Sequence, residues 1–217
     1  MAKACQESDV SGDPFKSGDQ GFPEIILAST SPRRGELLGV LGVQHRFVAS
    51  EALESEENQL TAWEVATLNA YRKARAVAKR FPDSVVLGAD TVVCLGAKLF
   101  GKPCDMAEAE SMLRALQGKT HQVVTGVCLI HLRAHRQRVF AETSDVTLLP
   151  LSIGAIRRYL GRIQPLDKAG AYAIQDHGSL IVSEISGSFS NVVGLPLERL
   201  KAALGFWGPG RQAGEPR

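Results

Sequence analysis

The sequence predicts a mixed α/β fold, on three observations. A short apolar run, a polar loop and a helical spacing of leucines follow one another within residues 24–41. Residues 85–95 form a nearly unbroken apolar run, which is typical of a central strand. Two segments, residues 122–132 and 137–149, alternate well enough to form a β-hairpin. No repeat or internal linker divides the chain, so we expect one folded domain.

Composition limits the classes of function. With 25 basic and 23 acidic residues the net charge is only +2, so no basic stripe for nucleic acid or a membrane surface is expected. No apolar run approaches the ~20 residues needed to span a bilayer. Four cysteines, Cys5, Cys94, Cys104 and Cys128, show no C-x-x-C spacing, and the chain starts without an apolar signal core. We therefore expect a soluble protein with reduced thiols in the cytoplasm.

The ends of the chain lack a hydrophobic period. Residues 1–21 are rich in Ser, Gly and Asp, and residues 208–217 are rich in Gly and Pro. Both compositions are typical of disorder. The predicted folded domain is therefore residues 22–207, between two disordered tails.

The pattern of residues 25–41 predicts a strand, a loop and a helix. Ser31 is a plausible N-cap, and Pro32 fits the first helical position. Arg33 and Arg34 follow at the open end of the helix, where free N–H groups and the helix dipole favour an anion such as a phosphate ester. A capped helix whose arginines point into solvent is the alternative.

The next segment predicts a strand within residues 45–50 and an acidic loop over residues 51–58. Thr61 and Glu64 then form the pattern of a capping box, which opens a helix running to about Arg80. The far half of this helix is basic. One face could aim Lys73 at an anion, but from the sequence alone we expect a solvated basic face.

A single carboxylate, Asp90, interrupts the apolar run of residues 85–95. Burying an ionised carboxylate without a partner costs roughly several kcal/mol. Asp90 must therefore be paired, bound to metal or placed at the edge of a site. A structural aspartate that accepts backbone amides is the alternative. Gly88 and Ala89 before it would let a ligand or another backbone approach closely.

The rest of the chain continues to alternate helices and strands. The expected elements are a turn at residues 101–103, a helix over 105–117, the hairpin, a helix over 152–161, a strand over 178–185, a turn at 185–188 and a helix that opens at Pro196. Asp105 and Glu108 again form the pattern of a capping box. Residues 165–175 mix small residues with an acid, a base and an amide, which is typical of a loop that lines a site.

Six motifs together closely resemble the Maf family of nucleoside triphosphate pyrophosphatases, in order, from about Ile25 to Leu204. They are residues 28–34 (Ala-Ser-Thr-Ser-Pro-Arg-Arg), 88–93 (Gly-Ala-Asp-Thr-Val-Val), 101–103 (Gly-Lys-Pro), Thr120-His121 with Thr125, 165–175 (Pro-Leu-Asp-Lys-Ala-Gly-Ala-Tyr-Ala-Ile-Gln) and 193–197 (Val-Gly-Leu-Pro-Leu). The segment from Asp167 to Gln175 resembles the branch that acts on dTTP and UTP, rather than the branch associated with 7-methyl-GTP.

The resemblance implies an inosine triphosphate pyrophosphatase-like fold: an elongated, twisted, mixed sheet with flanking helices and a cleft between two lobes, often as a homodimer. It also implies hydrolysis between the α- and β-phosphates, which releases a nucleoside monophosphate and pyrophosphate with Mg²⁺ or Mn²⁺. Two rival functions remain: a nucleotide-binding regulator of cell division without turnover, and a pyrophosphatase for 7-methyl-GTP or another modified nucleotide.

The resemblance also implies roles for particular residues. Asp90 matches the family's proton-accepting aspartate, while Arg33, Thr91 and Gln175 match positions linked to substrate choice, although Gln175 could equally cap a strand. Other substrate-site positions match Ser29, Ser31, Arg34, Lys73, Lys102 and Lys168. As metal ligands we expect Asp90 and Glu54, although Leu53 stands where a second acid is common in the family. The chain also has Ser144, Val146 and Leu148 where the family tends to show Thr-x-Val-x-Phe, a difference of packing rather than chemistry.

Overall fold

The computed structural model describes residues 22–53 and 59–207, and these residues form a seven-stranded mixed sheet. The strands are β1 (Ile25–Leu27), β2 (His45–Phe47), β3 (Val85–Leu95), β4 (Lys98–Phe100), β5 (Thr120–His131), β6 (Arg136–Leu148) and β7 (Val182–Ser186). The α-helices are α1 (Pro32–Val40), α2 (Ala62–Ala78), α3 (Met106–Leu116), α4 (Ile153–Leu160), α5 (Phe189–Val193) and α6 (Leu197–Leu204). The mixed α/β fold class is confirmed.

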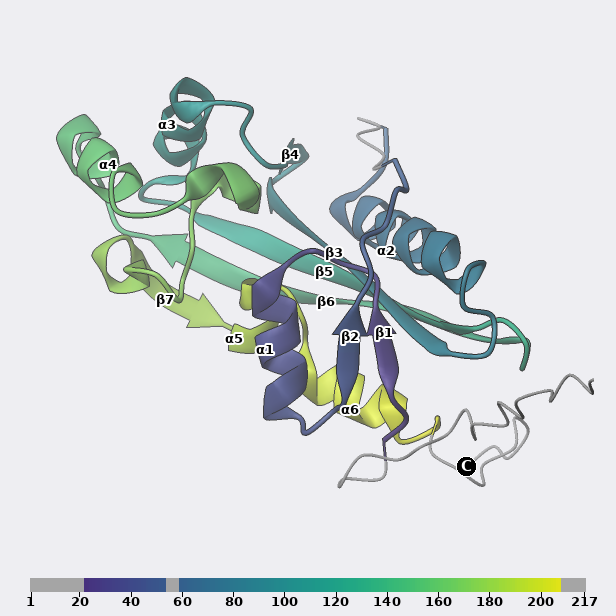
Figure 1. Cartoon of the computed structure of the whole chain (residues 1–217). Helices are drawn as coiled ribbons and strands as arrows, with labels where there is room; N and C mark the ends of the chain where they lie inside the picture. The colour runs from purple at the N-terminus through teal and green to yellow at the C-terminus, as the bar shows by residue number, and fades with distance from the viewer. Residues whose placement is uncertain (1–21, 54–58, 208–217) are drawn as a thin grey trace, which may run out of the picture.

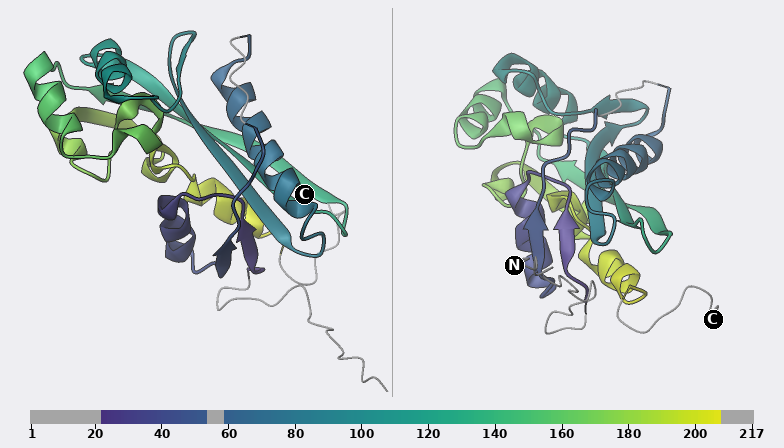
Figure 2. Two further views of the ribbon diagram at one scale, coloured as in Figure 1. Left: turned by 45° about the horizontal axis from the view of Figure 1, so that its top comes forward. Right: turned by 45° about the vertical axis from the view of Figure 1, so that its right-hand side comes forward.

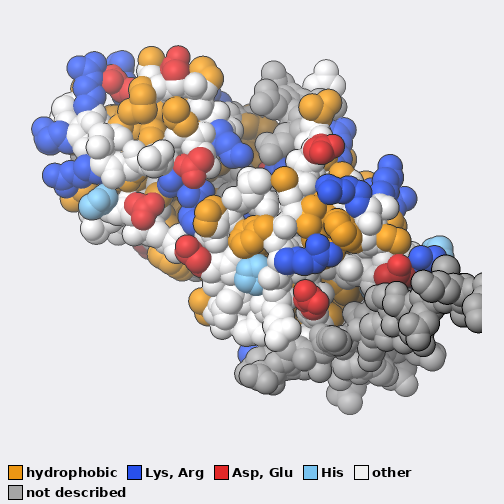
Figure 3. Space-filling model, in the orientation of Figure 1, with side chains coloured by type: hydrophobic (Ala, Val, Ile, Leu, Met, Phe, Trp, Pro, Cys, Tyr) orange, Lys and Arg blue, Asp and Glu red, His pale blue; other side chains and the backbone are white. Residues whose placement is uncertain are grey.

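The sheet is built around three long strands. Its order is β2-β1-β3-β5-β6-β7, with β4 paired to β3 outside this path. β1 runs parallel to β2 and β3, whereas β3, β5, β6 and β7 pair antiparallel. The long strands cross the molecule diagonally in Figure 1, and the turned views show an elongated, twisted sheet (Figure 2). On the face shown in Figure 3, Lys and Arg side chains are scattered among Asp and Glu rather than gathered in a stripe.

Helices cover both faces of the sheet. α2 lies on one face, while α1 and α6 lie on the other face at one end and α3 and α4 at the far end. Side chains alternate accordingly: Val86 and Cys128 pack under α2, and Leu87 and Leu129 pack toward α1 and α6. This period-2 alternation with apolar residues on both sides explains why the central strands are nearly continuous apolar runs.

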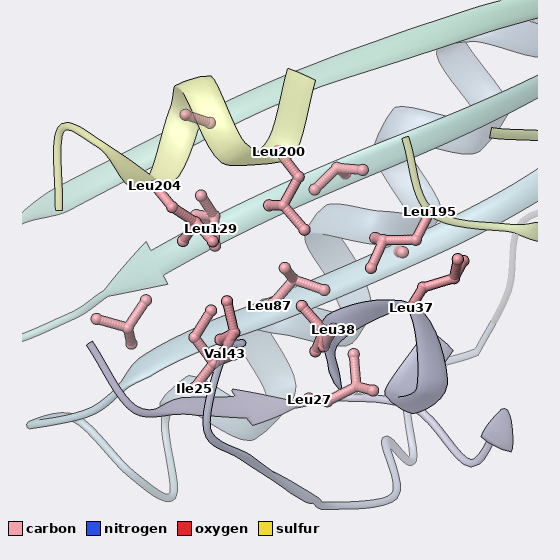
Figure 4. Close-up of a cluster of buried hydrophobic side chains, with 14 of the residues drawn as sticks. Ile25, Leu27, Leu37, Leu38, Val43, Leu87, Leu129, Leu195, Leu200 and Leu204 are labelled. Atoms are coloured by element: carbon pink, nitrogen blue, oxygen red, sulfur yellow. The ribbon is translucent and has the colours of Figure 1, made fainter. Parts of the chain in front are cut away.

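The core on the α1 side is divided into two clusters. In one of them, Leu38 of α1 and Leu200 of α6 pack on Leu87 and Leu129 of the sheet (Figure 4). In the other, residues of α3 and α4 pack on the far ends of β3, β5 and β6. Each cluster forms the interior of one lobe, and the long strands connect the two lobes.

A gap in the sheet lies between the lobes. On one edge of β3, Val85–Leu87 pair with β1 and residues 93–95 pair with β4. No strand within the described ranges lies beside residues 88–92 on that edge. β5 pairs with the opposite edge of β3 from Val86 to Cys94, so β3 continues across the gap. Asp90 and Thr91 are thereby held where a cleft opens.

Several predicted elements are corrected by the structure. The strand predicted over residues 178–185 starts only at Val182, because a 3₁₀ turn over Gly178–Leu180 follows a left-handed His177. Neither β4 nor the five-residue α5 was predicted. The capping box of Thr61 and Glu64 is confirmed, but at α3 the Glu108 carboxylate accepts the N–H of Cys104 rather than that of Asp105. Ser31 stands at the N-cap of α1 without a side-chain cap bond.

One predicted strand is shorter than expected, and some predicted segments lie outside the described residues. The strand expected over residues 45–50 spans His45–Phe47, and the predicted acidic loop lies partly outside the described residues, as do both predicted tails. Within residues 22–53 and 59–207, no helix is both long enough and apolar enough to cross a bilayer.

Candidate active site

A polar cleft opens at the gap between the lobes. Its walls come from the loop after β1, the start of α1, the middle of β3, the far half of α2 and the segment after α4. The residues predicted for the site that line it are Ser29, Ser31, Arg33, Arg34, Lys73, Asp90, Thr91, Lys102, Lys168 and Gln175. These side chains come from segments up to about 145 positions apart in the sequence, and the fold brings all of them to one surface.

Asp90 is buried and held by two side chains of α2. Only 7% of Asp90 is exposed. Lys73 Nζ donates to Oδ1 at 2.6 Å, and Asn69 Nδ2 donates to Oδ2 at 3.1 Å. A buried carboxylate is stable when it is both paired and hydrogen-bonded, and both conditions are met here. The expectation of a solvated Lys73 is therefore wrong, and Asp90 is paired rather than held by backbone amides alone.

Glycines on the sheet set the distance between α2 and Asp90. A Cβ on Gly126 would lie 2.3 Å from the carbonyl oxygen of Ala66, and a Cβ on Gly88 would lie 2.3 Å from that of Ala70. Gly126 pairs with Asp90 across β3 and β5. The close approach predicted for Gly88 is thus made by a helix backbone. Since α2 lies directly on the sheet, Asn69 and Lys73 reach Asp90.

Arg34 connects the opening of α1 to β3. Its guanidinium donates to the Gly194 carbonyl at 3.0 Å, to Ser29 Oγ at 3.3 Å and to Thr91 Oγ1 at 3.2 Å. Ser29 Oγ also accepts the backbone N–H of Ser31 at 3.1 Å. The alternative in which both arginines point into solvent is wrong, because Arg34 is fixed across the cleft wall.

Arg33 and Lys168 share one carboxylate. Arg33 Nη1 donates to Asp167 Oδ2 at 3.1 Å, and Lys168 Nζ donates to Asp167 Oδ1 at 2.7 Å. Partial burial raises the pKa of Asp167, but the hydrogen bonds and charges of Lys168 and Arg33 outweigh it, so that the pKa falls below its usual value. Lys168 is itself 6% exposed and also donates to the Gln164 carbonyl at 2.7 Å. Asp167 thus holds cations from both lobes together.

Behind Thr91 lies a chain of hydroxyl groups. Thr91 Oγ1 and Thr125 Oγ1 are 3.0 Å apart, and Thr125 Oγ1 donates to the Asn191 carbonyl at 2.9 Å. Thr125 has one hydroxyl proton, so Thr91 is the donor between the two threonines. The carbonyl comes from α5, which the sequence did not predict. These hydrogen bonds fix the hydroxyl of Thr91 and connect β3 through β5 to α5.

Tyr172 lines the cleft, and His121 is buried behind it. His121 Nε2 lies 2.7 Å from Tyr172 Oη. Burial lowers the pKa of His121 to about 4, although nearby Asp145 and the Lys119 carbonyl act in the opposite direction. Burial also raises the pKa of Tyr172. Both side chains are therefore neutral near pH 7, and the cleft wall at Tyr172 is uncharged.

The oxygen atoms of Asp90 suit a divalent ion that is shared with a substrate. Across residues 22–53 and 59–207, no three His, Cys, Asp or Glu side chains gather into a metal cage. Among the described residues, each Asp90 oxygen accepts one hydrogen bond, whereas an ionised carboxylate offers about four lone-pair positions. Mg²⁺ commonly uses one or two carboxylates together with substrate phosphates. Asp90 therefore fits an ion that is completed by a substrate; the second expected ligand, Glu54, lies outside the described residues.

A protein-family model matches most of the chain. The model described as Maf-like protein matches residues 24–206, which include every described residue that lines the cleft. The chain belongs to the Maf family. The resemblance stated from the six motifs is thereby confirmed.

Curated relatives cover most of this Maf-like protein. A dTTP/UTP pyrophosphatase of Bacillus velezensis is 45% identical over 181 residues, which cover 83% of this chain and 94% of the relative. A dTTP/UTP pyrophosphatase of Symbiobacterium thermophilum is 44% identical over 185 residues, which cover 85% and 94%. Among solved structures, the Ham1 protein of Staphylococcus aureus is 17% identical with a TM-score of 0.47, and the match covers 84% of this chain and 98% of that one.

The structure adds site residues to which the sequence assigned no role, although Thr125 and Asp167 stand within the six motifs. Asn69, Thr125 and Asn191 support Asp90 and Thr91, and Asp167 holds Arg33 and Lys168. Asn69 had a usable signal, since it lies one helical turn before Lys73 and shares its face. The contact between Arg33 and Asp167 spans 134 positions and had no local signal.

Proposed function

We propose that this Maf-like protein hydrolyses dTTP and UTP between the α- and β-phosphates, giving the nucleoside monophosphate and pyrophosphate. The observation that carries the proposal is a buried carboxylate, Asp90, that lies among five cations in a cleft between two lobes. The names of relatives at 42–45% identity over about 85% of the chain support the same reaction and the same substrates.

Charge in the cleft suits a triphosphate. Arg33, Arg34, Lys73, Lys102 and Lys168 line it together with two carboxylates, Asp90 and Asp167, which leaves an excess of three positive charges. The whole chain has a net charge of only +2. Positive charge is therefore concentrated at the cleft, where it can hold the phosphates and stabilise charge that develops on the leaving pyrophosphate.

Asp90 is the proposed general base. Its carboxylate is paired with Lys73 at 2.6 Å and can accept a proton from water as that water attacks the α-phosphate. Arg34 is held at the helix opening, where backbone N–H groups and the guanidinium together suit phosphate oxygens. Gln175, which carries both a donor and an acceptor, is the proposed reader of the pyrimidine edge together with Thr91.

We propose a divalent cation, Mg²⁺ or Mn²⁺, as the cofactor. Asp90 would hold it, with Glu54 as the second protein ligand. When bound, such an ion neutralises phosphate charge and lowers the pKa of coordinated water. We also propose a homodimer in the cytoplasm. The three cysteines within the described residues are free thiols, as reducing surroundings would leave them.

The test is a chromatographic assay of the purified protein with dTTP, UTP, CTP, dATP, GTP and 7-methyl-GTP, each with Mg²⁺ and Mn²⁺. We expect the monophosphate and pyrophosphate from dTTP and UTP. Asp90→Asn should lower kcat by about 100-fold or more, because it removes the base while keeping the shape of the side chain. Asp83→Asn is the matched control, since Asp83 is exposed and binds Arg133 at the hairpin end of the sheet.

Two results would contradict the proposal. A folded Asp90→Asn protein with near-normal turnover would remove Asp90 from the role of base. A wild-type protein that binds dTTP tightly but turns over no triphosphate would favour the nucleotide-binding regulator instead. Turnover of 7-methyl-GTP in preference to dTTP and UTP would refute the substrate assignment alone.

A further inference from the structure

Asn69 lies behind Asp90 and outside the cleft wall. It is 3% exposed, and the described residues that line the cleft include Lys73 and Asp90 but not Asn69. Its amide nitrogen lies 3.1 Å from Asp90 Oδ2. An ionised carboxylate only accepts hydrogen bonds, so the NH₂ end of the amide must face Asp90. Asn69 does not line the cleft, and its contact with Asp90 connects it to a residue that does.

One partner alone would not fix the carboxylate. The terminal torsion of an aspartate is broad, because it joins an sp³ carbon to an sp² carbon. Lys73 reaches Oδ1 at the end of a long flexible side chain, which can follow this oxygen as the carboxylate turns about the Cβ–Cγ bond. The second bond, from Asn69 to Oδ2, removes that rotation. The two donors are four positions apart on α2, so one face of one helix holds both oxygens.

We propose that Asn69 is a positioning residue that fixes the plane of the Asp90 carboxylate for proton transfer. The inference rests on the proposed function, since it takes Asp90 as the base. With Oδ1 and Oδ2 each bound from the α2 side, the remaining lone pairs of the carboxylate stay available to a water molecule in the cleft. Loss of Asn69 leaves the base in place but wrongly oriented.

The experiment compares Asn69→Leu with wild type, using dTTP turnover. Leucine branches at Cγ as asparagine does and fits a helix, but it donates no hydrogen bond. We expect kcat to fall by about 10–100-fold, as is typical for partners that orient a reactive group, while KM stays within about twofold. Asn69→Asp keeps the shape, replaces the donor with an acceptor and should lose at least as much. It also serves if the leucine variant does not fold.

The matched control is Thr67→Val on the same helix. Thr67 is 7% exposed, and its hydroxyl donates to the Trp63 carbonyl at 2.8 Å rather than to Asp90. This change also removes a buried polar group from α2 and keeps the side-chain shape. We expect kcat to stay close to the wild-type value, which separates general damage to the helix from loss of the contact with Asp90.

A double-mutant cycle supplies the decisive readout. If Asn69 acts through Asp90, then Asn69→Leu should cause almost no further loss of residual turnover in the Asp90→Asn protein. Equal loss in both backgrounds, or a kcat within twofold of wild type for Asn69→Leu, would overturn the inference while the proposed function survives. A wild-type protein without turnover would overturn both.

Discussion

The two carboxylates of the cleft are in opposite environments. Asp90 is 7% exposed, and its oxygens are bound by side chains of a single helix. The Asp167 side chain is 57% exposed, and it connects Arg33 to Lys168. A buried, fixed carboxylate suits a base, whereas an exposed carboxylate between two cations can exchange places with another anion. The different roles of these residues therefore follow from burial rather than from residue type.

His121 gives the stability of the protein a pH dependence. In the unfolded chain it titrates near its ordinary pKa of 6.5, whereas burial lowers the pKa to about 4 in the folded protein. Between these values the unfolded chain binds more protons, so the free energy of unfolding falls as the pH falls through this window. The expected loss is about 2 kcal/mol between pH 8 and pH 5.

Chemical denaturation at both pH values checks this contribution. In His121→Gln the loss between pH 8 and pH 5 should be smaller by about 2 kcal/mol, because the titrating group is gone. His135→Asn is the control: His135 is exposed and has a φ of 51°, which asparagine also accepts. If the two variants and the wild type lose equal stability, His121 does not titrate as described.

The sequence predicted the lining residues of the site better than their partners. Asp90 was identifiable because a charge inside an apolar run requires an explanation. The environment of Lys73 was misjudged, since a basic helix end more often faces solvent, and only the packing of α2 on Gly88 and Gly126 decides otherwise. Asp167 could not be assigned a partner, because its contact with Arg33 depends on how the two lobes meet.

At the scale of elements, the contact between α2 and the sheet determines the geometry at Asp90. Ala66, Ala70 and Ala74 of α2 are fully buried, and the sheet offers glycines opposite to them. Small residues on both sides bring a helix backbone unusually close to a strand. The side chains of Asn69 and Lys73 on α2 therefore reach Asp90 at the centre of β3.

Gly126→Ala should separate α2 from the sheet. The new Cβ would lie 2.3 Å from backbone atoms of Ala66, which cannot move without the helix. We expect the free energy of unfolding to fall by about 1–3 kcal/mol or more, and dTTP turnover to fall with it, since Lys73 and Asn69 move away from Asp90. Thermal melting and turnover of the same sample check both effects.

Gly39→Ala is the matched control. Gly39 lies within α1, and a Cβ there would meet no other atom within 4 Å. The change should stabilise the protein by about 0.5–1 kcal/mol, because glycine is unfavourable inside a helix. If both alanine variants behave alike, close packing at Gly126 is not what holds α2 in place.

Elements with a strong local signal were predicted, and those fixed by tertiary contacts were not. The capping box of Thr61 and Glu64 marked the start of α2 correctly, because both bonds are local. β4 has three residues and exists through its pairing with β3. α5 has five residues, and its Asn191 donates to the Val123 carbonyl and to Ser144 on the sheet. Such short elements carry too little periodicity to be recognised.

At the scale of the molecule, the cleft exists because the core is divided. Two apolar clusters lie on the same face of the sheet, one under α1 and α6 and the other under α3 and α4. The polar residues between them, including Thr91 and Thr125, interrupt an otherwise continuous hydrophobic layer. A substrate held by Arg34 on one lobe and Lys168 on the other would connect the two clusters.

Substrate should therefore stabilise the whole protein. In the Asp90→Asn variant, which keeps the cations and turns substrate over at least about 100-fold more slowly, dTTP at 100 times its Kd should add about 2.7 kcal/mol to the free energy of unfolding. For a chain of this size the melting temperature would rise by about 5–10 °C. Thymidine without phosphates should cause almost no shift; an equal shift with thymidine would mean that the cations do not hold the substrate.

Residues 1–19 should be dispensable for turnover. The family model begins at residue 24, and the first described residue that lines the cleft is Ala28. We expect a protein that lacks residues 1–19 to keep its kcat and KM for dTTP. A large loss of turnover in a truncated protein that still melts cooperatively would show that this segment contributes to the site.

The cluster of Arg33, Asp167 and Lys168 implies that the cleft is preorganised. In the absence of substrate, the Asp167 carboxylate occupies a place between two cations that a phosphate group could take. Long cationic side chains that are already ordered lose little conformational entropy when a ligand arrives. The entropy of ordering Arg33 and Lys168 is then lost during folding, once for the life of the molecule, instead of at every encounter with a nucleotide.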